Sequence, residues 1–114
     1  MRGADVLIKS LSDAGVRYIF TLSGNQIMSA FDASIDSGIE LIHVRHEASA
    51  VHMADAWGRL TGQPGVALVT AGPGMGNTVS ALYVALMSES PLLLLSGHAP
   101  ESHVGLGGFQ EMAQ

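Results

Sequence analysis

The chain has 114 residues, of which 47% are apolar and 13% charged, so it can fold around a core and is not a disordered segment. Its net charge is −5, and residues 71–114 contain no lysine or arginine, which argues against binding to a nucleic-acid backbone. The absence of cysteine excludes disulfides and thiolate metal sites. We expect a cytoplasmic protein without a signal peptide or membrane span, because charges interrupt the first twenty residues and every apolar run is short.

Helix-like and strand-like segments alternate through the first half of the chain. Residues 4–14 carry apolar side chains at helical spacing, and residues 16–22 are rich in the β-branched and aromatic side chains of strands. A second helix is predicted from Asn25, as its N-cap, to about residue 37. The segment "IELIHV" at 39–44 predicts a second strand.

The same alternation continues in the second half. A third helix is predicted from about His46 to Thr61, closed by a glycine and followed shortly by a proline. Residues 65–71 form a continuous apolar run, as in strands buried on both faces. A fourth helix at about 75–88 and a fourth buried strand at 91–97 complete the pattern before a glycine-rich tail.

The predicted third helix is unusually rich in small residues. We expect these residues to allow close approach of another helix, at a contact between subunits; they occupy positions 48, 49, 50, 54, 56 and 58. Trp57 and Leu60 are predicted to belong to the core.

This order of elements predicts an α/β fold with an open, mostly parallel sheet and helices on both faces. Ligands of such sheets gather at the carboxyl ends of the strands. Four segments fall there, namely 23–26, 45–47, 71–77 and 96–103. Because the sheet ends at the fourth strand, we expect residues 1–114 to be a single but incomplete domain.

The loop "GPGMGN" has the shape of a nucleotide-binding turn. Gly72 and Gly74 let the backbone approach a ligand, and the following helix offers free N–H groups. However, Asn77 stands where a dinucleotide fingerprint has its third glycine, so a dinucleotide site is disfavoured. A purely structural tight turn and close approach to another flat or anionic ligand both remain open.

Glu47 follows a predicted buried strand and begins the small-residue helix. A zinc-protease motif is excluded because Ala50 stands where the second histidine belongs, and we predict no metal ligands in the chain. Glu47 either stabilises the helix dipole or is a partly desolvated carboxylate that shares a proton with a ligand nitrogen. Phe109 and Gln110 in the tail either reach into a site or belong to a surface loop.

Five segments together carry a family resemblance: "LSGNQIMSAFDA", "HVRHEASAVHMADAWGRLTG", "GVALVTAGPGMGN", "SPLLLLSG" and "GFQEMAQ". They resemble the N-terminal pyrimidine-binding domain of thiamine-diphosphate-dependent enzymes, and within that superfamily the acetolactate synthase group. The resemblance implies that Glu47 hydrogen-bonds N1′ of the cofactor's aminopyrimidine and so promotes loss of the proton from thiazolium C2. It further implies that Phe109 and Gln110 border the reacting centre, with Gln110 counted among the catalytic residues. The cofactor-binding residues that it implies are Gly24, Glu47, Gly72, Pro73, Gly74 and Asn77.

The resemblance implies a transferase or lyase that decarboxylates a 2-keto acid such as pyruvate and transfers the two-carbon unit to a second keto acid. The diphosphate and Mg²⁺ of thiamine diphosphate would be bound by a domain absent from this chain, supplied by a second subunit or domain in a homodimer or tetramer. The 114-residue chain alone would then have no turnover, and dependence on FAD stays open. Alternatives are a 2-keto-acid decarboxylase, an acyl-CoA lyase, a sulfoacetaldehyde acetyltransferase, or a non-catalytic remnant.

Overall fold

Four parallel strands form one sheet in the order β2-β1-β3-β4. The computed structural model describes residues 1–113, so Gln114, the last residue of the resembling tail segment, lies outside the description. The strands are β1 (Tyr18–Thr21), β2 (Glu40–His43), β3 (Gly65–Val69) and β4 (Leu92–Ser96). The predicted α/β fold with a parallel sheet is confirmed.

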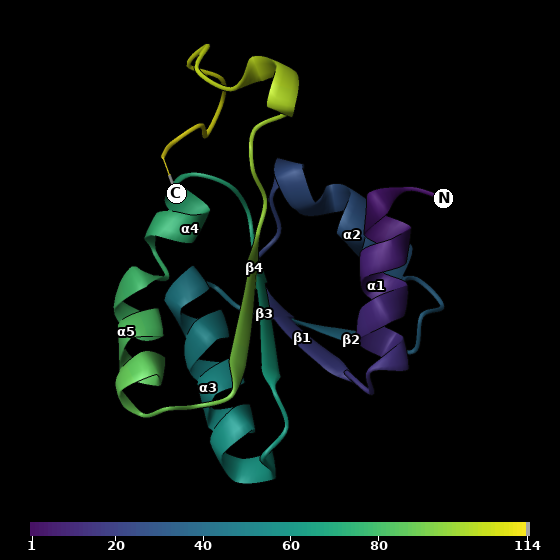
Figure 1. The fold of residues 1–114 in the computed structure, drawn as a ribbon, viewed down its shortest axis with the longest axis vertical. Helices are drawn as coiled ribbons and strands as arrows, with labels where there is room; N and C mark the ends of the chain where they lie inside the picture. The colour runs from purple at the N-terminus through teal and green to yellow at the C-terminus, as the bar shows by residue number, and fades with distance from the viewer. Residues whose placement is uncertain (114) are drawn as a thin grey trace.

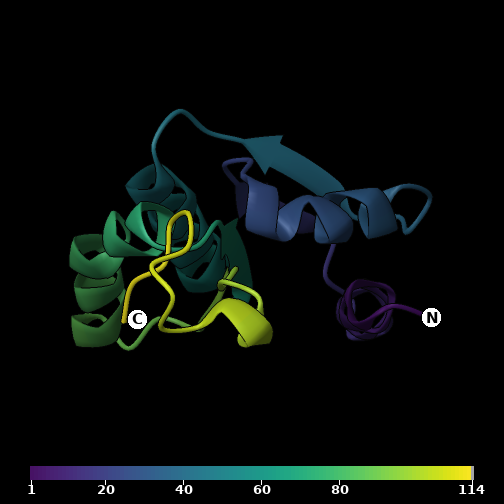
Figure 2. The ribbon, with the colours of Figure 1, turned by 90° about the horizontal axis from the view of Figure 1, so that it is seen from above.

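Helices cover both faces of the sheet (Figure 1). On one face α1 (Gly3–Asp13) packs beside α2 (Met28–Ser34), and on the other α3 (Glu47–Thr61) packs on β3 and beside α5 (Val79–Met87). The strand order reverses between β1 and β3, and this switch point is where open parallel sheets bind ligands. Figure 2 looks down on the carboxyl edge of the sheet and shows the tail folded back over it.

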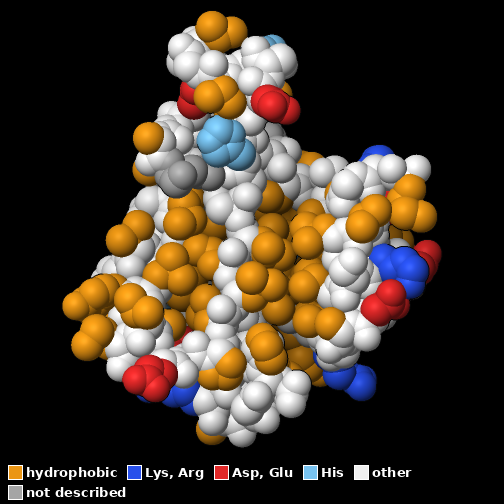
Figure 3. All heavy atoms as spheres, in the orientation of Figure 1, with side chains coloured by type: hydrophobic (Ala, Val, Ile, Leu, Met, Phe, Trp, Pro, Cys, Tyr) orange, Lys and Arg blue, Asp and Glu red, His pale blue; other side chains and the backbone are white. Residues whose placement is uncertain are grey.

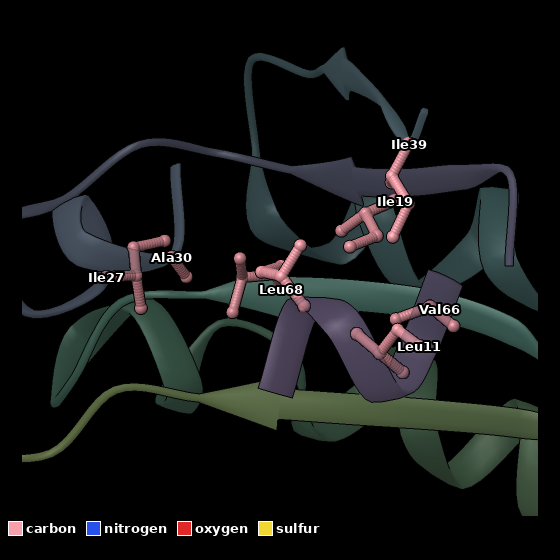
Figure 4. Close-up of a cluster of buried hydrophobic side chains, with 8 residues drawn as sticks. Leu11, Ile19, Ile27, Ala30, Ile39, Val66 and Leu68 are labelled. Atoms are coloured by element: carbon pink, nitrogen blue, oxygen red, sulfur yellow. The ribbon is translucent and has the colours of Figure 1, made fainter. Parts of the chain in front are cut away.

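The core has one cluster on each side of the sheet, because neighbouring residues of a strand point to opposite faces. Ile19 and Val66 point toward α1 and α2, in a cluster that Figure 4 shows. Phe20 and Ala67 point the other way, toward α3. The chain has no helix within residues 1–113 that is long and apolar enough to cross a membrane.

Helix α3 lies very close to the sheet. Ala50, Ala54 and Gly58 are buried, and a Cβ atom on Gly65 of β3 would overlap the carbonyl oxygen of Ala54. Three of the six small residues therefore serve a contact within the chain, where we expected a contact between subunits. Bulkier residues at these positions would push α3 away from the sheet.

Two predicted core residues of α3 differ in outcome. Trp57 packs edge to face on Tyr18, with the ring centroids 5.1 Å apart, as a core residue should. Leu60 was wrongly predicted, since it is 86% exposed. It lies in the last turn of α3, where the helical spacing of apolar residues continues but the side chain projects into solvent.

Two predicted helices are broken in the structure. The segment expected as one helix from Asn25 forms a 3-10 turn, Asn25–Ile27, before α2, and the N-cap of that turn is Gly24 without a side-chain cap. The segment expected as a helix at 75–88 is split into α4 (Pro73–Gly76) and α5. The split follows from the glycines of α4 and from Thr78, whose hydroxyl donates to the Met75 carbonyl at 2.6 Å.

Strands β2 and β4 were both predicted to be buried, but they form the two edges of the sheet, and the ends of β2 are exposed. Leu93 is 40% exposed, and apolar side chains reach the surface along β4 between α1 and α5 (Figure 3). Strand β3 has the predicted burial, because every one of its residues is buried. The difference arises because β3 has a strand on both sides and β4 on one.

Candidate functional site

The carboxyl ends of β1 and β3 meet at the switch point. Gly24 follows β1 and Thr70 follows β3, and a Cβ atom on Gly24 would overlap the Thr70 side chain. A Cβ atom on Gly74 would lie 2.6 Å from Cγ2 of Thr70. Two glycines thus allow the loop after β1 and the turn after β3 to close around Thr70, which is 6% exposed.

Glu47 is the first residue of α3 and lies at this edge. The chain turns from extended backbone into the helix at His46, whose Nδ1 accepts a hydrogen bond from the Ala48 amide at 3.1 Å. The Glu47 carboxylate is partly buried, and its Oε2 accepts a hydrogen bond from Asn77 Nδ2 at 2.9 Å. Its Oε1 accepts no hydrogen bond from residues 1–113 and lies 3.7 Å from where a Cβ atom on Gly74 would be.

The glycine turn between β3 and α4 has a backbone that only glycine adopts readily. Gly72 has φ +60° and ψ −116°, and a Cβ atom there would overlap the backbone carbonyl of Gln110. Pro73 is the first residue of α4 and is exposed, whereas Gly74 is buried. Asn77 is the C-cap of α4, which places its amide against Glu47.

The tail contributes one buried polar atom to this edge. Gln110 has φ +61°, and its side-chain oxygen is buried without a hydrogen-bond partner in residues 1–113. Phe109 is 73% exposed. The Glu111 carboxylate accepts hydrogen bonds from the amides of Gly105 and Gly108, and these bonds hold the pKa of Glu111 below its usual range.

Two residues that the sequence analysis did not single out connect these parts. Thr70 Oγ1 donates a hydrogen bond to Gln26 Oε1 at 2.8 Å, and Gln26 Nε2 donates to the Phe109 carbonyl at 3.2 Å. The only signal in the sequence is position, because each residue follows a strand at its carboxyl end. Their contacts span 44 and 83 residues of sequence and so cannot be read from local patterns.

The predicted site residues fall into two groups. Glu47, Gly74 and Asn77 come together in one contact cluster, and Gly72 contacts the backbone of Gln110. Phe109, by contrast, is largely exposed, as are Pro73 and Asn77. Chemically, the cluster offers a carboxylate with one fixed and one free oxygen beside glycine backbone, which suits a flat ligand with a nitrogen that shares a proton.

No three histidine, aspartate or glutamate side chains among residues 1–113 are placed to hold a metal ion. The sequence of the chain matches over residues 1–114 the family model of the thiamine pyrophosphate enzyme, N-terminal TPP binding domain. The chain belongs to this family. Thiamine pyrophosphate is another name for thiamine diphosphate, so the family is the one that the sequence resembles.

The relatives most similar in sequence include proteins named as acetolactate synthases and proteins named as 2-hydroxyacyl-CoA lyases. The chain is 40% identical over 112 residues to a probable acetolactate synthase of Mycobacterium bovis, and 42% identical over 112 residues to the acetolactate synthase isozyme 3 large subunit of Escherichia coli. It is 46% identical over 112 residues to 2-hydroxyacyl-CoA lyase 2 of Danio rerio. These matches cover 97–98% of this chain but 18–20% of each relative, so the chain spans about a fifth of their length.

Proposed function

We propose that this chain supplies the pyrimidine-binding half of a thiamine-diphosphate site in an enzyme that decarboxylates a 2-keto acid. Pyruvate is the proposed donor, and the two-carbon unit passes to a second keto acid, as in an acetolactate synthase. The observation that carries the proposal is the Glu47 carboxylate, with Oε2 fixed by Asn77 and Oε1 beside Gly74 without a hydrogen-bond donor in residues 1–113. A cytoplasmic location is in keeping with the cysteine-free sequence.

The residues of the site fit an aminopyrimidine ring. Glu47 offers an acceptor oxygen near the backbone of Gly74, where a flat ring with a ring nitrogen could reach it; the missing side chains of Gly72 and Gly74 make room for the Gln110 carbonyl and for Thr70. The buried side-chain oxygen of Gln110 offers a second acceptor to an amino group or a substrate hydroxyl. When bound, thiamine diphosphate would supply a thiazolium ring that adds to the keto carbon and accepts the electron pair left behind when carbon dioxide departs.

Glu47 would hold the proton at the ring nitrogen N1′. Its Oε1 is the atom free to share that proton, and a positioned carboxylate of this kind acts as a general acid and base. Asn77 would keep the carboxylate in one orientation through its bond to Oε2, so that Oε1 stays aimed at the ring. Gly24 would act indirectly, by letting the β1 loop close against Thr70.

A second subunit or domain would supply the groups that bind the diphosphate and Mg²⁺. An exposed apolar side of α5 supports such a contact, because Val79, Tyr83, Leu86 and Met87 are 58–70% exposed there. We propose a homodimer or tetramer. Analytical ultracentrifugation of the protein tests this, and a single species with the mass of a monomer throughout the micromolar concentration range would contradict it.

The relative from Danio rerio favours a second candidate, cleavage of a 2-hydroxyacyl-CoA. Both candidates use the same half-site and the same role for Glu47, so they differ in substrate alone. This candidate is kept because of the 46% identity, which is no lower than that of the synthases.

An assay of the assembled enzyme separates the candidates. We would supply thiamine diphosphate and Mg²⁺ and follow acetolactate formed from pyruvate, with a 2-hydroxyacyl-CoA as the alternative substrate. Cofactor-dependent acetolactate formation supports the first candidate, and cofactor-dependent cleavage of the acyl-CoA alone supports the second. Absence of both activities, in an assembly that binds the cofactor, would exclude both substrate classes.

A further inference from the structure

A hydrogen-bond relay connects the centre of the sheet to the tail. Thr70 donates to the side-chain oxygen of Gln26 at 2.8 Å, and the nitrogen of the same amide donates to the Phe109 carbonyl at 3.2 Å. Both polar ends of the Gln26 side chain are therefore used. One glutamine thus joins the end of β3 to a segment that follows β4.

The sheet end of this relay is rigid. Thr70 directly follows β3, is 6% exposed, and is enclosed by Gly24 and Gly74, whose missing Cβ atoms leave room for its side chain. A threonine so enclosed has one orientation for its hydroxyl, and β-branching restricts its χ1 rotation further. The relay therefore begins at a fixed point near Glu47, since a Cβ atom on Gly74 would lie 2.6 Å from Thr70 Cγ2 and 3.7 Å from Glu47 Oε1.

The other end of the relay lies in the tail, where residues 105–111 have a defined backbone conformation. Glu111 ties the amides of Gly105 and Gly108 into one loop, and Gln110 has φ +61°, a conformation that costs a non-glycine residue energy. The Gln110 carbonyl lies against Gly72 of the glycine turn. A segment with this conformation persists only where its surroundings determine it, and the bond from Gln26 to the adjacent carbonyl does so.

We propose that Thr70 and Gln26 are positioning residues that fix segment 108–112 over the glycine turn and thereby hold Gln110 against Gly72. The role of Gln110 toward a ligand rests on the proposed function, whereas the relay itself does not. Through the relay, the β1 loop, the glycine turn and the tail move as one unit. The wall of the site on the substrate side is then set by residues that do not touch the ligand.

Amide hydrogen exchange on the protein tests the relay. Thr70→Val keeps the shape of the side chain without the hydroxyl, and Gln26→Leu removes both amide groups. We expect the Gly108 and Glu111 amides to exchange about threefold to tenfold faster in each variant, the factor for one ordinary hydrogen bond. Matched controls are Thr61→Val and Gln63→Leu, which alter exposed residues at and just after the end of α3, at the opposite end of the molecule from the tail (Figure 1).

The double variant distinguishes a relay from two separate supports. In a relay, Thr70→Val combined with Gln26→Leu accelerates tail exchange no more than Gln26→Leu alone, because the second change removes a bond already lost. The proposal would be overturned if the exchange accelerations of the two single variants multiplied in the double variant, or if Gln26→Leu left the exchange of the tail amides unchanged. It would also be overturned if the amides of β1 and β3 exchanged faster by the same factor as those of the tail. None of these measurements requires the cofactor, so failure of the proposed function would show only in the substrate assays.

Discussion

Helix α3 carries two partly or fully buried carboxylates, about two helical turns apart, with opposite surroundings. Asp55 is buried, and Arg59 donates to both of its oxygens, from Nε at 2.9 Å and from Nη2 at 2.6 Å. Arg59 also donates to Ser88 and Ser90, so the pair ties α3 to the connection before β4. Within the described residues, Glu47 accepts one side-chain hydrogen bond, from Asn77, and its other oxygen accepts none.

The difference separates a carboxylate that holds the fold from one that is available to a ligand. The hydrogen bonds from Arg59, with a further one from Ser90, hold the pKa of Asp55 below its usual range, as expected for a structural ion pair. At Glu47 the protein fixes the orientation of the carboxylate and leaves Oε1 without a partner from residues 1–113. The two residues differ in burial, and they differ also in how many carboxylate oxygens accept a hydrogen bond from residues 1–113, which is two in Asp55 and one in Glu47.

The largest effect should come from Glu47→Gln. The amide keeps the size of the side chain but cannot share a proton in the same way, so the rate of the assembled enzyme should fall by roughly 10²–10⁴-fold. The melting temperature should stay within about 2 °C of wild type, because the one side-chain hydrogen bond of Glu47 within residues 1–113 comes from Asn77, which is exposed to solvent. Steady-state kinetics and thermal unfolding measure the two quantities.

Asp55→Asn is the matched comparison for that experiment. It should lower stability and leave the rate per folded molecule near wild type, since Asp55 lies away from the glycine turn. If Glu47→Gln retained activity within threefold of wild type, Glu47 would have no part in the chemistry, and the distinction between the two carboxylates would fail.

The next largest effect should come from Gly65→Ala, which disturbs the close packing on β3 of α3, the helix that carries both carboxylates. The added Cβ atom would overlap the Ala54 carbonyl, and α3 would have to move off β3. We expect a loss of roughly 3 kcal/mol in the free energy of unfolding, as in overpacked cores. Chemical denaturation measures it, with Gly3→Ala as the control because that position is open; equal stability of the two variants would contradict the packing argument.

The sequence predicted those elements whose signals are local. Helix α3 begins at Glu47 and closes at Gly62, which has φ +70°, as its acidic first turn and terminal glycine indicate. The unbroken apolar run of β3 correctly predicted a central strand. Strand β4 has a similar apolar sequence, but its Leu93 is 40% exposed. Whether a strand lies at the centre or the edge of a sheet depends on the fold and not on the local sequence.

Less of the candidate site could be predicted. Glu47, Gly74 and Asn77 stood out because a carboxylate at a strand end and a glycine turn are recognisable patterns, and the structure brings them together. Thr70 and Gln26 did not stand out, since a single threonine or glutamine after a strand is common. Their importance comes from long-range side-chain bonds, which depend on the strand order and on the fold of the tail.

A smaller effect should come from Asn77→Ala, which frees the second oxygen of Glu47. The carboxylate would then rotate, and we expect about tenfold weaker binding of thiamine diphosphate to the assembled enzyme, the equivalent of one hydrogen bond to a charged group. Titration calorimetry measures the affinity. Asn25→Ala, in an exposed position of the neighbouring loop, is the control, and equal affinities of the two variants would remove Asn77 from the site.

The smallest effect should be a pH-dependent one, in Asp55→Asn. Because the pKa of Asp55 is lowered in the folded state, the pair with Arg59 stabilises the protein fully above the unfolded pKa of about 3.9 and progressively less as the pH falls from there toward the folded value. At pH 7 the variant should melt about 5 °C below wild type, the shift expected for one charged hydrogen bond partly screened by solvent. That gap should narrow below about pH 4, as Asp55 of the wild type becomes protonated. A gap of the same size at pH 3 and pH 7 would mean that packing around Asp55, and not its charge, holds α3 to the connection before β4.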